Sequence, residues 1–261
     1  IKRYFKHIMI MIKQLLLLVG LVTFSSCQGT SQKKKETETK TEVEQETTTQ
    51  EEWISLFNGE TLDGWHQYNG DKIGEEWSVT DGVLTFEPKE NRKWGDGGKN
   101  IVTDQSFTSF VLSIEWNVSE AGNSGIFWGV QEGKEFGEPY VTGPEIQILD
   151  NERHPDAKAN PKFHQAGALY DLVQPTADVC NPAGEWNHVL LTVDHNANEG
   201  NVVFNGTEIV RFPLSGEVWD ELVNNSKFKG WEGFGAFKTG KIGLQDHDDK
   251  VSFRNIKIKV L

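Results

Sequence analysis

The chain has little of what marks several large classes of protein. Only two of its 261 residues are methionine and two are cysteine. No apolar run reaches the roughly 20 residues that a membrane-spanning helix needs, and Gly-rich loops of the P-loop or dinucleotide type are absent. The formal net charge of −13 lacks the basic excess that would neutralise nucleic-acid phosphates. We therefore expect no nucleic-acid partner and no nucleotide-binding fold of those two types.

The N-terminal residues 1–27 are predicted to be an export signal. Lys13 precedes an apolar run over 15–24, which ends in Ser25-Ser26-Cys27. Small residues directly before a cysteine resemble the lipobox of bacterial lipoproteins, in which the cysteine becomes the lipidated N-terminus. We therefore predict lipidation at Cys27 and a cell-envelope lipoprotein, periplasmic or at the outer-membrane surface, that reaches the membrane through its lipid anchor. A plain secretory signal is the alternative.

Residues 28–52 are predicted to be a disordered charged tether, because they alternate Thr and Glu after a lysine run and have almost nothing apolar to bury. Cys27 and Cys180 fall in segments with different roles, so no structural disulfide is predicted. We interpret Cys180 as a loop thiol.

Residues 53–261 are predicted to form one folded domain. The 26 glycines and nine tryptophans of the chain are typical of a β-rich protein with many turns. Asp81-Gly82 and Asn205-Gly206 are strong hairpin signals. Strands are expected at 53–57, 77–80, 83–86, 110–118, 125–130, 143–150, 166–171, 186–194, 201–205, 208–212, 241–245 and 251–261.

A single helix is expected at about 216–227. Ser215 is its candidate N-cap, and Val218, Leu222 and Val223 would form its apolar stripe. Many short strands with one short helix predict an all-β protein, a two-sheet antiparallel sandwich of the jelly-roll type.

The segment 143–150 is where function is expected to centre. Ile146 and Ile148 point to one side of the predicted strand, whereas Glu145 and Gln147 point to the other. Such a strand is typical of a sheet with the core behind it and a ligand in front. If the polar faces of other strands coincide with this one, the surface carries Glu115, Glu145, Gln147, Gln245 and His247, with Trp116, Trp128 and Trp186 as candidates for stacking on sugar rings.

An ordinary glycosidase would need a second acid beside Glu145. Retention of configuration requires two carboxyl groups about 5–5.5 Å apart, and inversion requires about 6.5–9.5 Å. The positions that follow on the same face are Gln147 and Leu149. This strand alone therefore cannot supply the pair, which counts against the ordinary mechanism.

Two groups of histidine and acidic residues are candidates for a metal site. His154 and His164 lie ten residues apart, and acidic residues cluster with His247 over 246–249. Neither group has the close spacing of a strong metal-binding motif. No cofactor is firmly predicted, and a divalent metal stays an alternative.

Ordered motifs run through essentially all of 53–261. They are Leu56-Phe57-Asn58-Gly59, Leu62-Asp63-Gly64-Trp65, Asn123-Ser124-Gly125-Ile126, Glu145-Ile146-Gln147-Ile148-Leu149-Asp150, Gly167-Ala168-Leu169-Tyr170, Glu185-Trp186-Asn187, Gly243-Leu244-Gln245-Asp246-His247 and Phe253-Arg254-Asn255-Ile256. Together they resemble the 3-keto-disaccharide hydrolase family, formerly a domain of unknown function, which has a concanavalin-like jelly roll.

The resemblance implies a hydrolase that cleaves 3-keto-glycosides or 3-keto-disaccharides. A sugar oxidised at C3 has an acidified hydrogen at C2, so one base can start an elimination that water completes. Glu145 or His247 would be the base and acid partners. Gln147, Gln245 and Asn123 would hold sugar hydroxyls, and Arg254, His154 or Tyr170 would stabilise the oxyanion, with Glu115 and Trp128 also facing substrate.

Two other classes of function fit the same fold. A lectin-like carbohydrate-binding module would use the same face without chemistry, and an adhesion domain on the tether is the third alternative. A buried Glu145 with a raised pKa would favour the enzyme, whereas an exposed face with stacked tryptophans would favour the lectin.

Overall fold

The computed structural model describes residues 52–91 and 98–261. The predicted signal over 1–27 and nearly all of the predicted tether lie outside the described residues. Among the residues that are described, no helix has the length and apolar character needed to cross a membrane.

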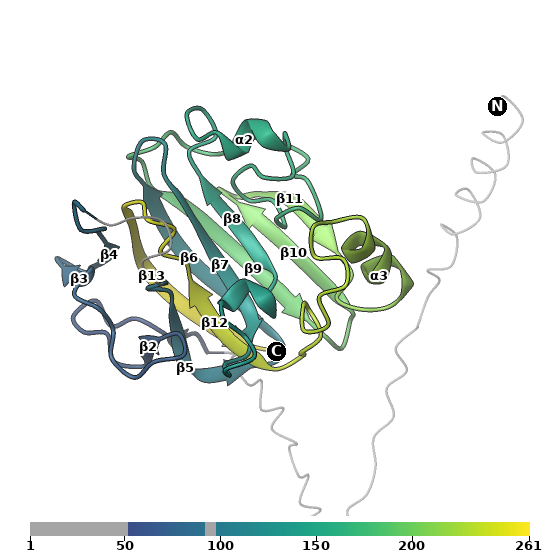
Figure 1. Ribbon diagram of the computed structural model, residues 1–261, viewed down its shortest axis with the longest axis horizontal. Helices are drawn as coiled ribbons and strands as arrows, with labels where there is room; N and C mark the ends of the chain where they lie inside the picture. The colour runs from purple at the N-terminus through teal and green to yellow at the C-terminus, as the bar shows by residue number, and fades with distance from the viewer. Residues whose placement is uncertain (1–51, 92–97) are drawn as a thin grey trace, which may run out of the picture. The chain divides into compact units, whose positions relative to one another are not determined.

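Two antiparallel sheets form the domain (Figure 1). The smaller sheet has the strand order β2-β5-β12-β7-β8, and the larger has the order β11-β10-β9-β6-β13-β4-β3, with β1 also paired to β13. The bounds are β1 Ile54–Ser55, β2 Trp65–Gln67, β3 Trp77–Thr80, β4 Val83–Phe86, β5 Ile101–Phe107, β6 Phe110–Val118, β7 Asn123–Val130, β8 Glu145–Leu149, β9 Asn187–Asp194, β10 Glu199–Phe204, β11 Thr207–Phe212, β12 Gly240–Leu244 and β13 Val251–Val260. The predicted two-sheet jelly-roll sandwich is confirmed.

The predicted helix exists as α3, Glu217–Asn224, but its cap and stripe differ from the prediction. Gly216 occupies the N-cap position with φ +87°, a conformation that glycine adopts without strain. The Ser215 hydroxyl instead donates to Asn198 Oδ1 at 2.8 Å. Of the predicted stripe, Leu222 and Val223 pack against the core, but Val218 is exposed, and Trp219 is the buried residue of the helix. The described residues also contain a single-turn helix, α2 (Asp156–Ala159), and a 3-10 turn, η2 (Pro139–Val141).

The predicted strand at 166–171 is wrong. This segment is a series of turns that reaches the free edge of β8 through single backbone hydrogen bonds. Gln147 donates to Ala168 O at 3.1 Å, and Tyr170 donates to Glu145 O at 3.0 Å. The segment therefore closes the edge of the sheet without extending it as a regular strand.

The alternation of side chains separates a core from an outer face. Ile146 and Ile148 of β8 join the buried cluster between the sheets, together with Ile126 and Trp128 of β7. Successive residues of a strand point to opposite sides, so the intervening side chains of β7 and β8 lie on the outer face of the five-stranded sheet. Glu145 is therefore outside the core, as predicted.

Candidate active site

Three adjacent strands place polar side chains on the outer face of the five-stranded sheet. In the β7–β8 pair, Phe127 lies opposite Glu145 and Gly125 lies opposite Gln147. Gln245, which directly follows β12, donates its backbone N–H to Gly125 O at 3.0 Å. Directly opposed residues of antiparallel strands share a face, so Gln147 and Gln245 flank Gly125.

Asn123, Gln147 and Gln245 form what we call the amide row. Their side chains are buried, with exposed fractions of 4%, 1% and 8%. Within the described part of the chain, the amide oxygen of each has no hydrogen-bond partner. A buried acceptor without a donor is costly, and native proteins rarely leave three of them together. The amide row is therefore suited to accept hydrogen bonds from the hydroxyl groups of a ligand.

The Glu145 side chain leans over Gly125. A Cβ built on Gly125 would collide with Glu145 Oε1, so only glycine leaves room for the carboxylate here. Glu145 is 7% exposed. Burial raises its pKa to about 8; the positive charge of Lys227 opposes this rise and the negative charge of Asp156 adds to it. Such a carboxyl exchanges a proton near neutral pH, as a general base or acid must.

The second acid near Glu145 is already engaged. Asp156 Oδ1 lies 2.8 Å from His164 Nδ1, and Asp156 Oδ2 accepts a hydrogen bond from the Tyr170 hydroxyl at 3.0 Å. The other ring nitrogen of His164 lies 3.0 Å from Asp171 Oδ1. Asp156 therefore orders the segment around Glu145, and neither of its oxygens is free to act as a nucleophile.

Lys227 joins the same group from the connection between α3 and β12. Its backbone N–H donates to Asp171 Oδ2 at 2.7 Å, and its ammonium lies 4.1 Å from the centre of the Tyr170 ring. The Tyr170 ring in turn stacks on His164 with ring centroids 4.3 Å apart. The cation is thus fixed on the Tyr170 ring, from where its charge lowers the pKa of Glu145.

Two imidazoles lie at the other end of the amide row. Asn123 Nδ2 lies 3.4 Å from His247 Nε2, and the His247 and His154 rings have centroids 6.2 Å apart. The backbone N–H of Asp156 donates to His154 Nδ1 at 3.1 Å, so the neutral ring carries its proton on Nε2. Burial lowers the pKa of His154, although the negative charge of Asp249 opposes the effect. His154 is therefore a neutral N–H donor near pH 7.

The structure places Glu115 and Arg254 far from this group, on the other sheet. Arg254 lies opposite Glu115 in the β6–β13 pair, and its Nε donates to Glu115 Oε2 at 2.7 Å. Its guanidinium also covers the Trp186 ring at 4.0 Å. The predicted alternation of β6 is present, but this strand belongs to the eight-stranded sheet, whose polar face looks the opposite way. The predicted shared surface is therefore wrong for Glu115, and so is the oxyanion-stabilising role expected of Arg254.

Trp128 is also not available to a ligand. It is 4% exposed and packs in the core against Phe212, with ring centroids 5.7 Å apart. Trp116 packs against Phe204 in the same core. Of the predicted site residues, the outer face brings together Glu145, Gln147, Gln245, Asn123, His154, His247 and Tyr170.

Lys227 and Asp156 are not identifiable from the sequence pattern. They lie in a connection and in a single helical turn, where no strand period assigns a direction to a side chain. The sequence suggests His164 only as a metal ligand, but its ring is bound to Asp156 and Asp171. Among residues 52–91 and 98–261, no group of three or more His, Cys, Asp or Glu side chains is arranged to hold a metal ion.

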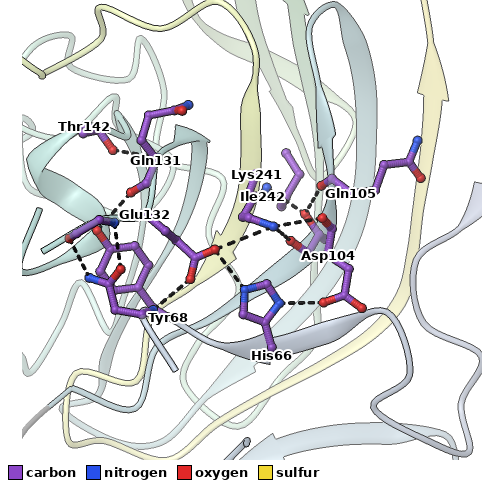
Figure 2. A network of polar contacts seen from close by, with 12 residues as sticks. His66, Tyr68, Asp104, Gln105, Gln131, Glu132, Thr142, Lys241 and Ile242 are labelled. Atoms are coloured by element: carbon purple, nitrogen blue, oxygen red, sulfur yellow. Dashed lines mark hydrogen bonds and ion pairs between the residues drawn. The ribbon is translucent and has the colours of Figure 1, made fainter. Parts of the chain in front are cut away.

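A polar network fixes the chain that leads into β8 (Figure 2). His66 of β2 lies 2.6 Å from Asp104 Oδ1 and 3.0 Å from Glu132 Oε2. The Tyr68 hydroxyl lies 3.0 Å from Gln131 O and 2.9 Å from Phe136 O. These contacts hold segment 131–142, which contains η2, against the five-stranded sheet.

The comparisons with known proteins agree on one family. The 3-keto-alpha-glucoside-1,2-lyase-like domain matches residues 52–259. A 3-keto-disaccharide hydrolase of Bacteroides thetaiotaomicron is 36% identical over 234 residues, covering 80% of this chain and 78% of the relative. A candidate glycosyl hydrolase from Parabacteroides distasonis, solved at 1.70 Å, is 30% identical with a TM-score of 0.72, covering 80% of this chain and 94% of that one. A second candidate from that organism, 23% identical with a TM-score of 0.60, shares the fold; it covers 80% of this chain and 100% of its own.

Fold, site and relatives together define a glycoside hydrolase built on a jelly-roll sandwich. The chain belongs to the 3-keto-alpha-glucoside-1,2-lyase-like family. The resemblance seen in the sequence motifs is thereby confirmed.

Proposed function

We propose that the protein cleaves 3-keto-glycosides or 3-keto-disaccharides by elimination followed by hydration. The observation that carries the proposal is a single buried carboxyl, Glu145, whose pKa burial raises to about 8, beside an acid that is already engaged on both oxygens. Ordinary glycosidases need two cooperating carboxyl groups. A substrate ketone at C3 removes that need because it acidifies the C2 hydrogen.

In this mechanism the keto ring lies over the amide row, whose oxygens accept its hydroxyl hydrogens. Glu145 takes the proton from C2, and the electron pair of that bond forms an enolate with its charge on the C3 oxygen. The enolate collapses, the C1–O bond breaks, and the leaving oxygen takes a proton. Water then adds its hydroxyl to C1 while a proton returns to C2, so the net reaction is hydrolysis.

The positions of the other groups suit the remaining roles. Asn123 is two residues from Gly125, about 6.6 Å along the strand, so the imidazoles and the Glu145 carboxylate can lie on either side of one sugar ring. The Nε2–H of His154, with His247, would donate to the C3 oxyanion. Lys227, whose charge acts on Glu145, would protonate the leaving oxygen.

The test compares 3-keto-glucosides with their unoxidised parents, each with and without a chelator. The proposal predicts release from the keto compounds alone, and loss of release in Glu145→Gln. Cleavage of the parent glycosides at a similar rate, or full activity of Glu145→Gln, would reject it. A loss of activity in the presence of the chelator would show that the reaction also requires a metal ion.

We also propose that residues 1–27 are an export signal and that Cys27 is lipidated. The prediction rests on Ser25-Ser26-Cys27 after an apolar run. Metabolic labelling with a fatty acid should mark the wild-type chain and leave Cys27→Ser unlabelled, and a labelled Cys27→Ser chain would contradict it.

A further inference from the structure

Two exposed aromatic rings lie together, one on the chain that enters β8 and the other in a connection of the chain far from it in sequence. Tyr140 of η2 is 37% exposed and Trp231, in the connection from α3 to β12, is 38% exposed. Their ring centroids are 6.2 Å apart, with 39° between the ring planes. Large aromatic side chains in this domain are mostly buried, so an adjacent exposed pair calls for an explanation.

The pair lies on the side of Glu145 away from the imidazoles. Tyr140 precedes Glu145 by five residues at the start of β8, whereas His247 lies beside Asn123, which is opposite Leu149 at the far end of that strand. Burial raises the pKa of the Tyr140 hydroxyl, and the negative charges of Glu138 and Glu145 raise it further. The Glu145 carboxyl is thus close enough to act on Tyr140.

The Trp231 ring is held in place by a series of packed aromatic side chains. The Trp231 ring meets Phe228 edge-on, with centroids 5.3 Å apart. Phe228 stacks on Phe234 at 3.8 Å, and Phe234 lies parallel to Trp219 of α3.

A backbone hydrogen bond joins the segment that carries Tyr140 to the connection that carries Trp231. Gly235 donates its N–H to Thr142 O at 2.9 Å, which links the Trp231 connection to the residues after η2. The Tyr68 hydroxyl fixes the residues that precede η2, through its contacts with Gln131 O (Figure 2) and with Phe136 O. Because both rings are already held in place, binding a ligand here costs little conformational entropy.

We propose that Tyr140 and Trp231 form a second sugar subsite, which binds the ring of the leaving group. The inference rests on the proposed function, because a base acting at a glycosidic bond has one ring on each side of it. The amide row offers polar acceptors for one ring, and the aromatic pair offers flat apolar faces for the C–H side of the other. The substrates are therefore glycosides whose leaving group is itself a pyranose or a similar ring.

The kinetic test compares a 3-keto-disaccharide with the methyl 3-keto-glucoside. Trp231→Ala should raise the KM for the disaccharide about tenfold, since one lost aromatic contact is worth about 1.4 kcal/mol. Its kcat/KM for the methyl glycoside should stay near wild type. Tyr140→Ala should act in the same direction. Equal losses on both substrates, or no loss on the disaccharide, would overturn the subsite.

Trp53→Ala is the matched control. Trp53 is 39% exposed and is also partly covered by a neighbour, the Lys257 ammonium. It lies beside β1, which pairs with β13 of the other sheet. The subsite predicts wild-type kinetics for this variant on both substrates, and a change equal to that of Trp231→Ala would contradict it.

A binding measurement separates the subsite from the proposed chemistry. If the wild type cleaves no 3-keto-glycoside, the proposed function fails by itself. The unoxidised disaccharide is then titrated into Glu145→Gln with and without Trp231→Ala. Weaker binding by about tenfold in the double variant supports the subsite, and unchanged or undetectable binding in both rejects it.

Discussion

The Glu145 carboxylate occupies the space that a side chain on Gly125 would fill. The acid and the glycine lie on neighbouring strands, and the glycine lets the acid lean toward the amide row. The placement of the base therefore depends on the absence of a Cβ on the next strand.

Gly125→Ala is expected to displace the carboxylate and lower kcat on 3-keto-glycosides by about 100-fold, because misplacement by about 1 Å can cost that much. Gly137→Ala is the matched control, since a methyl group at that position would have no other atom within 4 Å. Steady-state kinetics on both variants measures the effect. Equal activity of the two would show that the carboxylate need not occupy this position.

The pH dependence of kcat/KM should report the ionisation of Glu145. A base must be ionised to act, so kcat/KM should rise with pH through a value of about 8, the raised pKa of Glu145. Lys227 lowers that pKa, so Lys227→Met should move the rising limb to higher pH, whereas Lys227→Arg should leave it near its place. If kcat/KM of Lys227→Met rises at the same pH as in the wild type, the charge of Lys227 does not act on the base.

Stability should depend on pH through the same carboxyl. The pKa of Glu145 is about 8 in the folded chain against an ordinary 4.5, so the folded state holds the proton more tightly. This contribution to stability is full below pH 4.5 and is lost as the pH rises through about 8.

Glu145→Gln, which carries no charge, avoids that loss. Its free energy of unfolding relative to wild type should increase by a few kcal/mol between about pH 4.5 and about pH 9, at about 1.4 kcal/mol per pKa unit. Urea unfolding at several pH values measures the difference. A difference that is the same at all pH values would mean that Glu145 is not desolvated.

The Tyr68 hydroxyl should stabilise segment 131–142. Tyr68→Phe leaves Gln131 O and Phe136 O without this donor, and a lost hydrogen bond of this kind costs about 1 kcal/mol. Thermal unfolding measures the cost. The KM for a 3-keto-disaccharide should also rise, because this segment carries Tyr140; an unchanged KM would separate the network from the subsite.

Much of the sheet system could be predicted because each strand carries its own signal. The alternation over 110–118 and the turn Asp81-Gly82 predict the bounds of β6, β3 and β4 as observed. The strand β5 is not predicted because its exposed residues are consecutive and do not alternate with buried ones. Segment 166–171 is predicted as a strand because it is apolar, but its burial comes from lying over the edge of β8.

The site could be predicted only as far as the alternation of single strands reaches. Period two assigns Glu145 and Gln147 to one face and Gln245 and His247 to another, and the resemblance adds Asn123, His154 and Tyr170. Which strands share a sheet is a property of topology that a local pattern does not contain, so the prediction assigns Glu115 to the wrong surface. Lys227 lies in a connection, and only tertiary packing brings it to Glu145.

The fate of the hydrogen at C2 tests the central claim most directly. A 3-keto-glycoside deuterated at C2 is cleaved by the wild-type protein, with an enzyme-free sample correcting for spontaneous exchange. The account predicts that cleavage is slower than with the protonated substrate and that deuterium passes to solvent. Cleavage at the same rate, with the deuterium fully retained at C2 of the released sugar, would contradict it.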